Sequence, residues 1–560
     1  MLLVGGAQTA IGAAEGAAEP PRHFAITGSG NYLAGRFARD INDLEAATAY
    51  LGAALEEDPD RLALMRQTMT VSVMSGNYGE AVDLAKRVTP RVPRAMIARL
   101  LLIIDALQDS RLDEALELVE SLDKKGGGNI IQPLTRAWVL VGLKRYDDAL
   151  AELDAMNANK NLADFANLHK AMVLDVAGRD AEAETAYLAA ADSDQGISLR
   201  VTLLLGAQYE RREMPEKATD LYQRYKDEHP NSTLIDPLLA RLVPASQAQP
   251  RPTAAGGLAE AMFSLASSFG RQSSRETSLI FGRLALFLDG DFALARILVA
   301  EILEENSRWA DANADYDRIP AASPFQWIAQ VRMAGNLNRM DQPDAAITLL
   351  DALAAEHPQQ VDPLVEMGDI LRSHSRFEEA ATAYDRAVAR LEALGREIGW
   401  VLHYHRGITL ERTKRWDRAE ADFLTALELQ PDQPLILNYL GYSWVEQGKN
   451  LDQAREMIEK AVSLRPRDGY IVDSLGWVLY RLGDFAEAVK HLERAVELMP
   501  EDPVINDHLG DAYWKVGRHL EANFQWRRAL SLGPEADVEE DIRKKIQQGL
   551  VAGGGTGDNG

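Results

Sequence analysis

Aromatic side chains with a polar edge recur through the last third of the chain. They are Tyr404, Tyr439, Tyr442, Tyr470, Trp477, Tyr480 and Trp514. Tyrosine and tryptophan combine a large apolar ring with one hydrogen-bonding group, and such side chains dominate the energetics of protein interfaces. The chemistry that these side chains can perform is therefore non-covalent binding. Two interpretations stay open: the rings bind a partner segment, or they pack against one another along one wall.

Polar side chains accompany these rings and could hydrogen-bond the backbone of an extended peptide. They are Asn438, Asp473, Arg481, Asp507 and Asp511. The set differs from a carboxylate clamp, which grips a C-terminal carboxylate with lysine and asparagine. Only Asn438 fits that pattern, and the aspartates would repel an acidic tail. We expect these positions to bind a protein or an extended peptide segment, but not an acidic C-terminus.

Motifs for catalysis or metal binding are missing or incomplete. The chain has no cysteine, which excludes thiol chemistry and zinc thiolate sites. His403 and His405 stand two residues apart on a predicted helix, so they point to different faces and cannot share a metal. The run from Lys124 to Gly128 lacks the Gly-Lys-Ser/Thr of a phosphate loop. We expect no enzyme, no catalytic residues, no metal and no cofactor.

Small or special residues at three fixed spacings reveal the elements that position these side chains. The glycines Gly407, Gly441, Gly476 and Gly510 are 34, 35 and 34 residues apart. The same spacing relates Ala419, Ala454, Ala488 and Ala522, and also Pro431, Pro466, Pro500 and Pro534. A ladder of this kind resembles the tetratricopeptide repeat, a helix–turn–helix unit of about 34 residues. The resemblance implies an all-α fold, an α–α superhelical solenoid that presents a surface to partners.

The ladder separates residues that the fold requires from residues that it leaves free. Glycine and alanine stand where the two helices of a repeat approach most closely, and a larger side chain there would cost roughly 1–3 kcal/mol through overpacking. We expect Gly476→Leu or Ala488→Trp to unfold a repeat. The aromatic and polar residues above fall mainly on the first helix of each repeat, on the side that faces the concave groove. Packing does not dictate them, so they are the candidate binding residues.

Phasing the whole chain against the ladder predicts about fourteen repeats in two arms. Residues 28–230 form a degenerate N-terminal arm of about six repeats, and 258–534 form a C-terminal arm of about eight. Between them, 231–257 is rich in proline and is predicted to be a linker with a short helix near 234–242. Five extra residues around 392–397 should lengthen one second helix. Residues 535–550 are predicted to form a capping helix, and the glycine-rich residues 551–560 are predicted to be a disordered tail.

Composition narrows the classes of partner and leaves the compartment open. A formal net charge of −25 argues against binding to nucleic acid or to anionic membranes. No stretch reaches 18 apolar residues, so no transmembrane segment is expected. Residues 1–27 begin with a small, apolar stretch that has no lysine or arginine before position 22. They are either the remnant of an export signal, which implies a periplasmic protein, or a disordered tail of a cytoplasmic one.

Two runs are more specific than the generic repeat. The first combines Asn438-Tyr439-Leu440-Gly441-Tyr442 with the segment from Asp473 to Gly483, and the second combines His508 to Asp511 with Trp526 to Leu530. Together they resemble the C-terminal repeats of bacterial cell-envelope tetratricopeptide adaptors of the LbcA type, for which NlpI is a smaller functional counterpart. The resemblance implies a non-enzymatic periplasmic scaffold that recruits a carboxy-terminal-processing protease, its substrates or both. A cytoplasmic or envelope-assembly scaffold with another partner is the alternative.

Overall fold

The computed structural model describes residues 27–122, 128–157, 162–191, 197–229, 232, 234–242, 251–269 and 275–550. In these ranges it contains thirty α-helices and no strand, as the repeat ladder predicts. The predicted leader up to residue 26, the tail 551–560 and residues 243–250 of the predicted linker lie outside the described part of the chain. The helices fall into two compact units, 1–340 and 341–560, which we describe separately.

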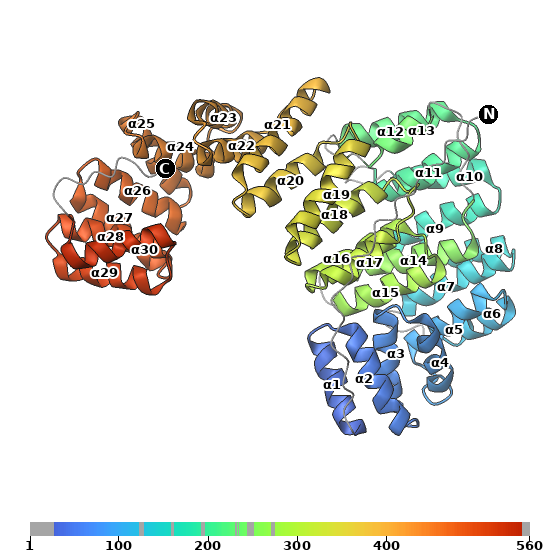
Figure 1. Ribbon diagram of the computed structural model, residues 1–560. Coiled ribbons are helices and arrows are strands. Elements are labelled where there is room, and N and C mark those ends of the chain that lie inside the picture. The colour runs from blue at the N-terminus through green and yellow to red at the C-terminus, as the bar shows by residue number, and fades with distance from the viewer. Residues whose placement is uncertain are drawn as a thin grey trace, which may run out of the picture. The chain divides into compact units, whose positions relative to one another are not determined.

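Unit 1 contains helices α1 to α18 (Figure 1). Their bounds are α1 Gly28–Asp40, α2 Leu44–Glu57, α3 Leu62–Met74, α4 Tyr78–Val88, α5 Met96–Gln108, α6 Leu112–Glu120, α7 Gly128–Gly142, α8 Tyr146–Asn157, α9 Ala163–Val176, α10 Asp180–Ala191, α11 Leu199–Arg211, α12 Pro215–Glu228, α13 Asp236–Leu242, α14 Ala254–Phe269, α15 Arg275–Leu288, α16 Ala293–Glu305, α17 Trp309–Asp317 and α18 Gln326–Arg339.

Unit 2 contains helices α19 to α30. Their bounds are α19 Pro343–Glu356, α20 Asp362–Ser373, α21 Phe377–Ala393, α22 Trp400–Arg412, α23 Trp416–Leu429, α24 Pro434–Glu446, α25 Leu451–Leu464, α26 Gly469–Arg481, α27 Phe485–Leu498, α28 Pro503–Lys515, α29 His519–Ser531 and α30 Ala536–Gln548. Helix α21 has 17 residues where α23, α25 and α27 have 14, so the extra residues lengthen a second helix as predicted.

Successive helices pair as antiparallel hairpins, and the ladder residues lie at the contact between the two helices. A methyl group added to Gly476 would lie 2.5 Å from Cγ of Leu492 and 3.2 Å from that residue's backbone nitrogen. Gly510 leaves similar room for the indole of Trp526, and Ala488 is fully buried. The close approach of the two backbones explains why the repeat needs small residues at these points.

In each hairpin turn that the structure describes, a left-handed residue follows the first helix. Gly483 and Gly517 have φ of +86° and +81°, which only glycine adopts without strain. In the α20–α21 and α22–α23 hairpins Ser375 and Lys414 take the same conformation, with φ of +57° and +61°. The turn geometry is therefore shared by repeats in which the sequence carries no glycine signal.

Helices α14 and α15 fill the inside of unit 1. They pack on α3, α5, α7 and α9, which are the first helices of four consecutive hairpins (Figure 1). A methyl group on Gly257 of α14 would lie 2.1 Å from the Trp138 ring of α7, so the two helices touch closely. Arg283 of α15 donates from Nε to the carbonyl of Met74 at the end of α3, at 3.1 Å. The groove of these repeats is occupied by the protein's own helices.

This packing places the boundary of the compact units away from the predicted linker. The prediction divides the arms at 231–257, whereas the units divide at 340/341. The repeats α14–α15 and α16–α17 belong to unit 1 because α14 and α15 bury their side chains against its first helices. The short helix predicted near 234–242 is α13, and the predicted capping helix corresponds to α30.

Candidate functional site: the first-helix wall of unit 2

The predicted binding residues lie on a row of first helices in unit 2. This row consists of α22, α24, α26 and α28, and we call it the first-helix wall. In it each helix contacts the next one through side chains as well as contacting its own hairpin partner. Eleven of the twelve predicted residues are buried or partly buried along α22, α24, α26 and α28, or bonded there to a neighbouring helix. The exception is Tyr470, which is 55% exposed near the start of α26.

The first part of the wall is an aromatic cluster. The ring centroids of Tyr404 and Tyr439 lie 6.0 Å apart in an edge-to-face arrangement, and both rings pack on Phe423 at 6.2 and 5.2 Å. The hydroxyl of Tyr439 donates to Oε2 of Glu411 at 3.1 Å. Burial and this carboxylate raise the pKa of Tyr439 well above its usual value. Here the rings pack against one another, which was one of the two interpretations of the sequence.

The middle of the wall carries a stack of three rings. The Trp477 ring stacks on the Tyr480 ring with centroids 4.8 Å apart. It also stacks on the His508 ring, with centroids 4.0 Å apart. Its indole Nε1 donates to Oε1 of Glu446 at 2.7 Å. The guanidinium of Arg481 binds the same oxygen at 3.0 Å. Trp477 and Tyr480 remain partly exposed and Arg481 is exposed, so this is an edge that a partner can reach.

His508 of this stack also forms a buried ion pair with Asp473. The Nδ1 of His508 lies 3.0 Å from Oδ2 of Asp473, and both side chains are at most 10% exposed. Burial opposes protonation of His508, but the carboxylates of Asp473, Asp507 and Asp511 outweigh it and raise the pKa of His508. Asp473 thus holds α26 to α28 and is already engaged, so a peptide cannot use it without breaking this pair.

Helix α30 covers the end of the wall. The ammonium of Lys545 lies 2.7 Å from Asp507 and 2.9 Å from Asp511, and all three side chains are at most 12% exposed. Asp511 also accepts a hydrogen bond from the indole of Trp526 at 2.8 Å. A methyl group on Gly549 would lie 2.0 Å from the Trp514 ring. Asp507, Asp511 and Trp514 therefore bind the protein's own C-terminal helix.

Two predicted residues lie between these clusters. Asn438 has a buried side-chain oxygen with no hydrogen-bond partner among the described residues. An unpaired buried amide oxygen costs roughly 1–3 kcal/mol, and because this atom has almost no exposed surface, a partner reaches it only if neighbouring side chains move. Tyr442 is partly buried near Glu446 and Asp473, and burial raises its pKa. Tyr442 therefore lies on α24 close to the Trp477 stack.

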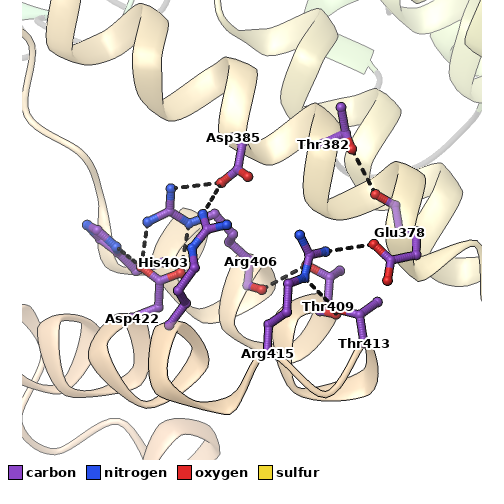
Figure 2. A network of polar contacts seen from close by, with 10 residues as sticks. Glu378, Thr382, Asp385, His403, Arg406, Thr409, Thr413, Arg415 and Asp422 are labelled. Carbon is purple, nitrogen blue, oxygen red and sulfur yellow. Dashed lines mark hydrogen bonds and ion pairs between the residues drawn. The ribbon is translucent and has the colours of Figure 1, made fainter.

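Sequence reasoning missed a polar network between α21, α22 and α23 (Figure 2). His403 and Arg406 both bind Asp422, at 2.9 Å and 2.6 Å, and Arg406 also reaches Asp385 at 3.3 Å. Burial raises the pKa of Asp422, but the hydrogen bonds from His403 and Arg406 outweigh it and the pKa lies below its usual value. The partners come from three helices with no common motif, so only the fold brings them together.

His403, His405 and His508 are each paired with a different carboxylate. His403 pairs with Asp422 and His405 with Asp369, so the two histidines face different neighbours as the sequence predicts. No group of three or more histidine, aspartate or glutamate side chains in the described ranges is arranged for a metal ion. Across the same residues, no helix is both long enough and apolar enough to cross a membrane. What the wall offers chemically is stacking, hydrogen bonding and charge pairing.

Comparison with known proteins identifies the repeat type. Family models match a tetratricopeptide repeat-like domain over 288–400, a tetratricopeptide repeat over 404–469, a TPR repeat over 476–517 and a further tetratricopeptide repeat over 201–232. These matches cover α24 and α28 of the first-helix wall and leave 470–475, in the first half of α26, outside.

Two curated proteins are similar to parts of the chain. The TPR repeat-containing protein PA4667 of Pseudomonas aeruginosa is 28% identical over 198 residues, which are 35% of this chain and 32% of that protein. The protein O-mannosyl-transferase Tmtc1 of Drosophila melanogaster is 28% identical over 102 residues, 18% of this chain and 12% of that protein. The chain thus spans about a third or less of the length of these relatives.

Among solved structures, the chain is similar to the APC/C hetero-tetramer Cut9–Hcn1, at 14% identity and a TM-score of 0.38 over 94% of this chain and 97% of that one. It is also similar to yeast Tom70, at 14% identity and a TM-score of 0.34 over 93% and 94%. The matched segments and the repeated helix hairpins together show that the chain contains tetratricopeptide repeats.

Proposed function

We propose that the protein is a binding scaffold and that unit 2 holds a partner protein through the middle of the first-helix wall. The observation that carries this proposal is the stack of Trp477 on Tyr480, which is partly exposed and flanked by the exposed Arg481. Stacking and the bond to Glu446 already fix the indole, so binding would cost it little conformational entropy. A rigid aromatic anchor beside a charged rim is typical of an interface hot spot.

The two ends of the wall have other roles in this proposal. Tyr404 and Tyr439 pack against Phe423, and Asp507, Asp511 and Trp514 hold α30. The partner segment then contacts Tyr442, Trp477, Tyr480 and Arg481. Tyr470 would contact the partner only at the margin because it lies at the exposed start of α26.

We further propose that the scaffold is a periplasmic adaptor, and that its partner is a carboxy-terminal-processing protease, a substrate of that protease, or both. The support is the resemblance of the runs around Gly441, Gly476 and Gly510 to cell-envelope adaptors. A solenoid can bind two proteins at once and raise their effective concentration without new contacts between them. No catalytic role is assigned to the chain itself.

The test of the wall uses the full chain and its co-purifying partner. Once the partner is identified and purified, its affinity is measured for the parent and for Trp477→Ala, Arg481→Glu and Phe524→Ala. Phe524 is the control, because it is 68% exposed on the second helix α29, away from the wall. Loss of an aromatic hot spot costs about 2 kcal/mol or more, so Trp477→Ala should weaken binding at least about thirtyfold.

Arg481→Glu is included because the Arg481 side chain is exposed and its replacement leaves the ring stack in place. Weaker binding by this variant is therefore not explained by misfolding. Equal affinities for all three variants and the parent would refute the wall as the binding site. The adaptor role is tested separately, by cell fractionation and by the rate at which the purified protease degrades a substrate with and without the chain. An unchanged rate would refute the adaptor role and leave the scaffold role standing.

A further inference from the structure

A second polar cleft lies in unit 1, apart from the first-helix wall. Helix α2 forms one side, α15, α16 and α17 form the other, and the turn after α3 closes the end. The cleft has a volume of about 1210 Å³. That exceeds the upper end, about 1,000 Å³, of ordinary small-molecule pockets, so it has room for a segment of another chain.

Three arginines converge on the α15–α17 side of this cleft around a single carboxylate. Arg283 and Arg296 bind Asp315 at 2.9 and 3.3 Å, and Arg318 lies on the same side of the cleft. Asp315 and the two paired arginines are at most 11% exposed. Arg318 is exposed and forms no ion pair with any residue in the described part of the chain. Around Asp315 itself positive charge is therefore in excess, whereas the rest of the cleft lining carries Glu45, Glu56, Glu57, Glu80 and Asp311.

The protein's own contacts leave part of each buried guanidinium free. Arg283 uses Nε on the carbonyl of Met74 and Nη1 on Asp315. Arg296 uses Nε on the carbonyl of Gly290 and Nη1 on Asp315. Within the described ranges the Nη2 groups make no hydrogen bond. Burial, together with the neighbouring charges of Arg318 and Arg283, outweighs Asp315 and Asp291 and holds the pKa of Arg296 below its usual value.

The opposite side of the cleft has a different character. Helix α2 presents Thr48, Ala49, Gly52 and Ala53, whose small side chains let a backbone approach closely. Toward its end the helix carries the exposed Glu56 and Glu57, which repel anions. A bound anionic group is therefore confined to the arginine side, while the rest of a bound segment runs along α2.

We propose that this cleft is a second binding site of the scaffold, and that it takes a partner protein segment whose acidic side chain binds Arg283, Arg296 and Arg318. A carboxylate fits because it can accept paired N–H donors from a guanidinium, in the way Asp315 already does. The proposal does not depend on the first-helix wall, which lies in the other unit and was expected to reject acidic tails. It would let one molecule bind two segments of opposite chemistry.

The test measures binding of acetylated hexaglutamate amide to the full chain by calorimetry at low salt. Non-specific attraction is small because a chain of net charge −25 repels this peptide at long range. We compare the parent with Arg318→Gln and with Arg66→Gln, which removes the same charge from an exposed position on α3 outside the cleft. Inorganic phosphate is titrated in parallel.

The expected result is saturable binding of the peptide that Arg318→Gln weakens roughly tenfold, the usual effect of losing a charged hydrogen bond, and that Arg66→Gln leaves unchanged. Absence of binding, or equal weakening by both variants, would overturn the proposal. Phosphate that binds as tightly as the peptide and responds to the same variant would mean an adventitious ion only, which also overturns it. Because Arg318 forms no ion pair with the described residues, its substitution should leave the fold intact, and circular dichroism checks this.

Discussion

The two aspartates that share Lys545 make the stability of the C-terminal helices depend on pH. Asp511 is 6% exposed, and its carboxylate competes with that of Asp507 for one ammonium group. Burial and the charge of Asp507 raise the pKa of Asp511 to about 6 from the ordinary 3.8. With its pKa raised by about two, the folded state favours the protonated carboxyl over the carboxylate by roughly 3 kcal/mol more than the unfolded chain does.

The sign follows from proton binding. Between about pH 4 and pH 6 the folded state binds a proton at Asp511 that the unfolded chain has already released. The contribution of this group to stability is therefore largest below about pH 4 and is lost as the pH rises through 6. Asp511→Asn cannot titrate. Relative to the parent, the free energy of opening of this variant should rise by about 3 kcal/mol from pH 4 to pH 7.

Hydrogen exchange of α28 to α30, corrected for intrinsic rates at each pH, measures this difference locally. A local assay is needed because the end of a solenoid opens without the rest. Asp541→Asn is the control, since Asp541 lies 3.3 Å from the same ammonium group but is 54% exposed. Its profile should run parallel to that of the parent. If the Asp511→Asn profile is also parallel to the parent, the reasoning about shared burial is wrong.

Three further outcomes follow from packing and buried charge. Gly476→Leu should abolish the cooperative melting of unit 2, because the new side chain has no space beside α27; retention of the parental melting temperature would contradict this. Arg406→Met leaves Asp422 without its guanidinium and should cost roughly 3–5 kcal/mol in urea unfolding, whereas Arg418→Met, half exposed, should cost at most about 1 kcal/mol. Gly79→Ala has open space and a helical backbone, so thermal melting should show a gain of up to about 1 kcal/mol.

Local contacts explain which parts of the fold were predictable. Each repeat folds mainly against its neighbours, so the requirement for Gly476 and Ala488 recurs at a fixed spacing and is visible in the sequence. The same phasing found the residues of the first-helix wall. It could not tell that Tyr404 and Tyr439 pack on Phe423 while Trp477 keeps an accessible edge, because these outcomes depend on which ring of the next helix each one meets.

Long-range contacts explain the rest. The division at 340/341 arises because α14 and α15 return to the first helices of repeats much earlier in the chain, and no repeat spacing records such a return. The pairing of Lys545 with Asp507 and Asp511 brings two candidate ligand-binding residues into contact with the C-terminal helix. The arginine cluster around Asp315 has no sequence motif at all.

The sequence by itself determined the repeat, its helix hairpins and the small residues at their contacts, because those interactions are local and repeated. Only the tertiary structure decided which faces stay open. It filled the inside of unit 1 with α14 and α15, closed the end of the wall with α30, and gathered Arg283, Arg296 and Arg318 on one side of a cleft. The physical reason is that burial and charge pairing depend on which surfaces meet in space, and distant repeats meet only after the chain has coiled.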